Sequence, residues 1–75
     1  MVTIVVISKR SGDPLEGKRV SISYGGFFSG GTTDKKRTDS RGEVHFDIKP
    51  CQGKVYVEGD KVYEGEIAGR VVVYI

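Results

Sequence analysis

The strongest constraint on the fold of this chain is a period of two in its apolar residues. β-Branched and aromatic residues alternate with polar ones in short runs, and Gly, Pro, Asp and Ser separate the runs. Because the side chains of a strand point alternately to opposite faces, each run can bury one face and expose the other. No stretch of ten residues has the 3.6-residue period of an amphipathic helix. The predicted strands cover residues 2–8, 18–24, 43–48, 54–58, 62–67 and 71–75.

Strands at this spacing are typical of a sandwich or a barrel. The chain has 75 residues, enough for one core and not for two. We therefore predict one all-β domain over residues 1–75, a β-sandwich of six or seven mainly antiparallel strands. Turns are predicted at 11–14 and 50–53, and Gly59-Asp60 is predicted to close a tight hairpin. The predicted core comprises the inward-facing apolar residues Ile4, Val6, Val20, Ile22, Val44, Phe46, Ile48, Val55, Val57, Ile67 and Val73.

Residues 25–42 interrupt the alternating pattern. This irregular segment combines a Gly-rich stretch at 25–31 with a basic run at 35–37. A structureless loop of this length is unusual in so small a domain. We therefore expect part of it to pair, as a weak strand near residues 27–33 or 33–38.

Two stretches of the sequence carry a recognisable pattern of turn and strand residues. The first is Gly12-x-Pro14-Leu15-x-Gly17-x-x-Val20-x-Ile22. The second is Thr38-Asp39-x-x-Gly42-x-Val44-x-Phe46-x-Ile48-x-Pro50, followed by Gly53-x-Val55-x-Val57. Together they resemble the carboxypeptidase-regulatory-like, transthyretin-like group of β-sandwiches, which are relatives of the bacterial immunoglobulin-like modules. The resemblance implies an immunoglobulin- or transthyretin-like sandwich and an accessory, adhesive or scaffolding role without catalysis.

The chain departs from this group in its Gly-rich basic insertion at 25–37 and in the absence of an export signal. Hydrolases of the transthyretin-like group keep a specific set of His and Arg residues and a Tyr-Arg-Gly-Ser-like tail. This chain has one His and finishes with Val73-Tyr74-Ile75. The resemblance therefore does not extend to the hydrolase activity.

The charge distribution limits the kinds of partner that the chain can bind, and its first residues indicate a compartment. The net charge is +2; residues 1–42 carry eight Lys/Arg against four Asp/Glu, and residues 43–75 carry four against six. Nucleic-acid binders usually show a stronger bias, so the sequence predicts a local basic patch only. Residues 1–7 lack the charged start of a secretory signal, which favours the cytoplasm for a complete gene product. No apolar run approaches the ~20 residues of a membrane helix, so no membrane insertion is predicted.

Candidate catalytic and metal-binding residues are few. Glu43, His45 and Asp47 lie two apart on one strand, and an imidazole with two carboxylates can hold a metal. Their separation of ~7 Å instead favours a polar strand face in water. Cys51 with His45 suggests a nucleophile and a base, but Cys51 lacks the helix N-terminus or cation cluster that activates a thiol. The Gly-rich stretch lacks the context of a phosphate-binding loop. We predict no catalytic residue, no metal and no cofactor, and hence no enzyme.

Two features of the later strands bear on recognition. Tyr56, Tyr63 and Tyr74 would form a cross-strand stripe on neighbouring strands, which either stabilises a sheet or receives a ligand. The final strand, residues 70–75, contains five apolar residues. At a sheet edge it would offer open backbone groups to a copy of itself or to a partner strand. The alternative is a buried final strand.

The functional prediction is a non-catalytic protein-interaction or structural module. Phe27 and Phe28 are predicted to be apolar anchors for a protein partner, and Lys35, Lys36 and Arg37 are predicted to steer an acidic partner toward them. The alternative is a nucleic-acid-binding small β-barrel. In that alternative the aromatic residues of the same 25–37 segment stack on bases while its cations hold phosphates.

Overall fold

The computed structural model of the protein describes residues 1–25 and 30–75, and these form an all-β structure without a helix. In chain order the strands are β1 (Val2–Ile7), β2 (Arg19–Tyr24), β3 (Gly31–Thr32), β4 (Lys36–Arg37), β5 (Glu43–Phe46), β6 (Cys51–Val57), β7 (Asp60–Ile67) and β8 (Arg70–Tyr74). The all-β prediction is confirmed. Two of the strands, β3 and β4, lie within the irregular segment, where part of the chain was expected to pair.

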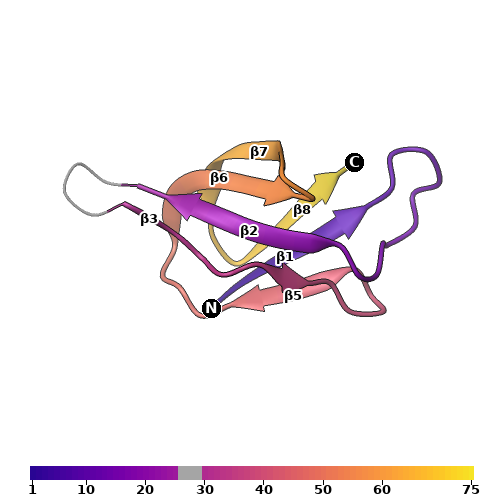
Figure 1. Ribbon diagram of the computed structural model, residues 1–75, viewed down its shortest axis with the longest axis horizontal. Helices are drawn as coiled ribbons and strands as arrows, with labels where there is room; N and C mark the ends of the chain where they lie inside the picture. Colours follow the sequence, from indigo (N-terminus) through magenta and orange to yellow (C-terminus); the bar gives the residue numbers. More distant parts are fainter. Residues whose placement is uncertain (26–29) are drawn as a thin grey trace.

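The strands form two sheets. One sheet has the order β5-β1-β8, with β1 in the middle (Figure 1). The other has the order β3-β2-β6-β7, and β4 also pairs with β2. Most neighbouring strands are antiparallel, whereas β1 and β8 run parallel, with Thr3 beside Arg70 and Ile7 beside Tyr74. The first and last strands are therefore partners in one sheet.

One apolar core lies between the two sheets, because the period of two gives each sheet one apolar face. The three-stranded sheet contributes Val2, Ile4, Val6, Val44, Phe46, Val71 and Val73, and the other sheet contributes Val20, Ile22, Val55, Val57 and Ile67. Every predicted core residue is buried except Ile48, which is partly buried against the cluster.

The outer face of β1 is also partly covered, as its nearly continuous apolar sequence predicts. Val5 is only 3% exposed although it points away from the core residues Ile4 and Val6. Its cross-strand neighbours are Glu43 on β5 and Val72 on β8. An ion pair from Glu43 to Arg70, at 3.2 Å, spans β1 and shields this side.

The predicted turn at 50–53 is wrong, because β6 already begins at Cys51. Gly53 lies inside the strand and pairs with Tyr24 on β2 and Gly65 on β7. A Cβ atom on Gly53 would collide with the backbone oxygen of Ser23. This glycine permits a close approach between strands, and its presence does not mark a change of chain direction.

The hairpin between β6 and β7 is confirmed, with its turn one residue earlier than predicted. Val57 pairs with Asp60, so the two connecting residues are Glu58 and Gly59. Both have positive φ, at 52° and 87°. This is the backbone geometry of the two-residue turns that match the twist of a hairpin.

The motif at 38–42 forms a tight turn that enters β5. Thr38 is 4% exposed, and its Oγ1 donates to the Leu15 carbonyl at 2.6 Å and accepts from the Lys18 N–H at 3.0 Å. Gly42 has φ +73°, and a Cβ atom there would lie 2.7 Å from the Val6 carbonyl oxygen. These contacts tie the turn to β1 at Val6 and to the first motif at Leu15 and Lys18.

Candidate functional site

The predicted basic residues lie on β4 and just before it, along the edge of β2. Arg37 pairs with Arg19, and Lys36 pairs with Val20. Because Val20 is buried in the core, alternation places Lys36 on the inner side and the flanking residues on the outer side. The outward cations Arg19, Lys35 and Arg37 form what we call the basic face.

Lys36 makes internal contacts. Its Nζ donates to the His45 carbonyl at 3.0 Å and lies 5.4 Å from the centre of the Phe46 ring. The side chain thus runs from β4 in one sheet to β5 in the other, where its ammonium group is attracted by the aromatic face. Lys36 therefore makes a contact between the two sheets, whereas Lys35 and Arg37 flank it on the outer side.

Arg19 and Arg37 lie directly opposite each other on the basic face. Like charges at this position of an antiparallel pair destabilise a sheet. Arg19 Nε donates to Glu58 Oε2 at 2.9 Å, and Arg37 Nη1 donates to the Gly17 carbonyl at 3.0 Å. The hydrogen bond from Arg19 lowers the pKa of the Glu58 carboxyl. Among the described residues, Glu58 is the one carboxylate that forms an ion pair with a cation of the basic face.

The basic face contains a small hollow. A hollow of about 80 Å³ lies among its residues, lined by Arg19, Ser21, Lys35, Glu58 and Gly59. Its volume suits a single carboxylate or a similar small anionic group. This geometry fits contact with acidic side chains of a partner and is too small to enclose a drug-sized substrate.

The predicted anchors Phe27 and Phe28 lie outside the described residues. On either side of them, Tyr24, Gly25 and Gly30 contribute to a second hollow of about 570 Å³, together with residues 48–51. Ile48, Pro50 and Cys51 give this hollow an apolar side. The two segments that line this hollow are far apart in sequence, so their proximity depends on the tertiary structure.

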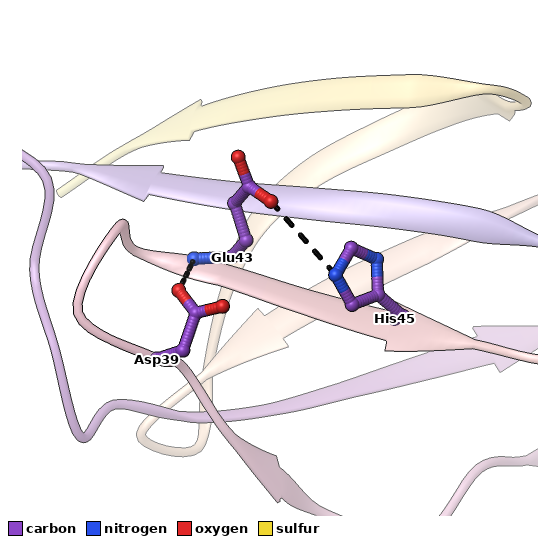
Figure 2. Close-up of side chains that lie close together, drawn as sticks. All are labelled: Asp39, Glu43 and His45. Atoms are coloured by element: carbon purple, nitrogen blue, oxygen red, sulfur yellow. Dashed lines mark hydrogen bonds and ion pairs between the residues drawn. The ribbon is translucent and has the colours of Figure 1, made fainter.

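The polar face of β5 carries a second cluster, shown in Figure 2. Single ligand atoms of Asp39, Glu43 and His45 lie within 4.8 Å of one another. The third member of the cluster is thus Asp39, and the predicted grouping of Asp47 with Glu43 and His45 is wrong. The turn at 38–42 brings Asp39 back beside the first residue of β5.

Each member of this cluster has partners within the protein. Asp39 Oδ1 accepts from the N–H groups of Arg41 at 2.8 Å and Glu43 at 3.0 Å. These backbone hydrogen bonds lower the pKa of the Asp39 carboxyl. Glu43 pairs with Arg70 at 3.2 Å, and His45 Nδ1 lies 2.8 Å from Thr3 Oγ1. The cluster caps a turn and links the three strands of its sheet.

Cys51 and Tyr63 make contacts within the protein. Cys51 packs against the core from the start of β6. The predicted stripe of Tyr56, Tyr63 and Tyr74 is wrong, because β8 pairs with β1 in the other sheet. Tyr63 pairs with Val55, the neighbour of Tyr56 on β6, so Tyr56 and Tyr63 point to opposite faces of their sheet. The Tyr63 hydroxyl donates to the Glu66 carbonyl at 2.6 Å.

No family model, curated protein or solved structure matches this chain. Within residues 1–25 and 30–75, the structure has no helix of the length and apolar character that a membrane span requires.

Proposed function

We propose that the chain is a non-catalytic protein-interaction module that binds an acidic protein segment on its basic face. The supporting observation is the direct opposition of Arg19 and Arg37, with Lys35 on the same outer surface. Sheet stability disfavours this arrangement, whereas an acidic partner would neutralise it. The resemblance to transthyretin-like and immunoglobulin-like modules, which we retain as a proposal, agrees with such a role.

Residues 30–37 run from the second hollow to the basic face. Their strands β3 and β4 pair with opposite ends of β2, near Tyr24 and Arg19 respectively. A partner that follows this edge of β2 would meet apolar surface at one end and cations at the other. Such a combination of apolar contact with charge steering suits a protein partner.

Nucleic acid remains the alternative partner, because the same cations would hold phosphates. The barrel assumed for that alternative differs from the two sheets that the described strands form. The two partners also differ in salt response. Binding to phosphates weakens steeply as salt rises, whereas contact with apolar surface is less sensitive.

The test is affinity capture from a lysate of the source organism, with and without nuclease treatment, at low and high salt. The test variant replaces the three cations of the basic face with Gln. The matched control neutralises three exposed cations elsewhere, Lys9, Arg10 and Arg41. We expect one retained protein that the wild type and the control capture and the basic-face variant loses. Equal capture by all three would refute the site, and retention only without nuclease would favour nucleic acid.

A further inference from the structure

The open edge of β8 is the least protected strand edge in the described part of the chain. The edge strand β7 of the other sheet contains Asp60, Lys61, Glu64 and Glu66, and charged residues discourage pairing with other chains. In β8, Arg70 is followed by four uncharged residues, and the strand pairs with β1 alone. Proteins usually place charged residues on an exposed edge strand to prevent pairing with other chains. The lack of charge along β8 therefore indicates that this edge pairs with a partner.

The opposite edge of the same sheet, at β5, is already satisfied from within the chain. The Glu43 N–H donates to Asp39 Oδ1, and the Glu43 carbonyl accepts from the Asp39 N–H. The His45 carbonyl accepts from Lys36 Nζ. These contacts occupy both outward backbone groups of Glu43 and the outward carbonyl of His45. The edge at β8 is therefore the more open of the two edges of the three-stranded sheet.

The free backbone groups of β8 belong to its even-numbered residues. Toward β1, the Gly69 carbonyl accepts from Thr3, and Ile75 both donates to Ile7 and accepts from Lys9. Because successive residues alternate, the N–H and carbonyl groups of Arg70, Val72 and Tyr74 face away from β1.

The same residues carry the exposed side chains of β8. Val72 is 39% exposed and Tyr74 is 54% exposed. Val72 lies beside Val5, and Tyr74 lies beside Ile7, which is half-buried. The edge thus presents free hydrogen-bonding groups together with an apolar outer surface.

This pattern is complementary to itself. If Val72 lies opposite Val72 of a second antiparallel copy, Arg70 lies opposite Tyr74 at both ends. All three pairs are then of the hydrogen-bonded type, in which each pair exchanges two backbone bonds. The Arg70 guanidinium would also lie beside the aromatic ring of the second copy. The net charge of +2 per chain adds little repulsion.

We propose that the protein forms a two-fold symmetric dimer in which β8 pairs antiparallel with β8 of a second copy, centred on Val72. The two three-stranded sheets then join into one continuous sheet with the order β5-β1-β8-β8-β1-β5. This surface is separate from the basic face on β2 and β4, so the dimer stands or falls independently of the proposed acidic partner.

Sedimentation equilibrium of the full chain tests the dimer from about 1 μM to about 1 mM, a range that detects weak association. The expected mass rises from 8.2 kDa toward twice that value. Val72→Lys and Val72→Glu should each weaken association at least tenfold, because each places like charges opposite one another. An equimolar mixture of the two variants should restore the dimer. Thr32→Lys adds the same charge to an exposed position of β3 and should leave the dimer unchanged.

Three outcomes would overturn the proposal: a wild type that stays monomeric at about 1 mM, a dimer that survives both Val72 variants, or a mixture that fails to re-associate. Disulfide trapping tests the same register if the charged variants do not fold. In a Cys51→Ser background, Val72→Cys should give a crosslinked dimer on oxidation and Thr32→Cys should not. Residues in a hydrogen-bonded pair lie ~5.5 Å apart between Cα atoms, within the range that a disulfide bridges. Equal crosslinking of both variants, or of neither, would also overturn it.

Discussion

Gly42→Ala is expected to be among the most damaging single-methyl additions to this protein. Gly42 has φ +73°, and the added Cβ would lie 2.7 Å from the Val6 carbonyl oxygen and 2.9 Å from Pro14 Cβ. The Val6 N–H also donates to the Gly42 carbonyl at 2.8 Å. Neither neighbour is a flexible side-chain end, so β1 and the turn into β5 would have to separate.

The expected cost has two parts. The left-handed backbone costs an Ala residue about 1–2 kcal/mol. Overpacking of a tight site costs about 1–3 kcal/mol more. The sum of about 2–5 kcal/mol is a large share of the roughly 4–11 kcal/mol that a chain of this length has available. We therefore expect a fall in melting temperature of at least about 10 °C.

Gly12→Ala is the matched control. Gly12 has φ +77°, close to that of Gly42, yet a Cβ atom there would meet nothing within 4 Å among the described residues. It should cost only the backbone part, about 1–2 kcal/mol. Urea unfolding of both variants measures the difference, provided that their m-values agree. If the two free energies of unfolding differ by less than about 0.5 kcal/mol, the close approach at Gly42 has no energetic weight and the reasoning fails.

Two further predictions concern the same turn. Thr38→Val should destabilise the protein by about 2 kcal/mol, because it removes the hydroxyl that bonds the Leu15 carbonyl and the Lys18 N–H; Thr38→Ser retains the hydroxyl and should cost less than half as much in the same urea assay. Asp39→Asn should make the protein lose less stability when the pH is lowered. The pKa of Asp39 is lowered by its backbone hydrogen bonds, so its contribution is present above the ordinary carboxyl pKa and disappears as the pH falls through the lower folded value. The drop in melting temperature from about pH 5 to about pH 2.5 should therefore be smaller in the variant, and an unchanged drop would contradict this assignment.

Much of the strand pattern is predictable from the sequence because it depends on local alternation. The predicted strands at 18–24, 43–48 and 54–58 each bury apolar residues on the face that their period of two predicts. Pairing between strands that are distant in sequence is not predictable in this way. Nothing local to residues 70–75 specifies that this strand lies parallel to β1. The predicted tyrosine stripe requires Tyr74 to lie in the same sheet as Tyr56 and Tyr63, and it does not.

The site was less predictable for the same reason. A run of three basic residues gives no indication that Lys36 points inward to His45 and Phe46 while its neighbours point outward. That division depends on the register of β4 against β2. Likewise, Asp39 approaches His45 only because a turn folds back, and sequence spacing along β5 favoured Asp47. The register of a short edge strand requires the tertiary structure.

The parallel pairing of β1 with β8 has a mechanical consequence. Because both strands run in the same direction, a pull on Val2 and on Tyr74 acts on opposite ends of the shared ladder, whose register extends from Thr3–Arg70 to Ile7–Tyr74. Tension then loads its hydrogen bonds together in shear, whereas antiparallel neighbours joined by a hairpin can be peeled apart one bond at a time. A protein tethered through these two strands would resist stretching and release abruptly at its rupture force.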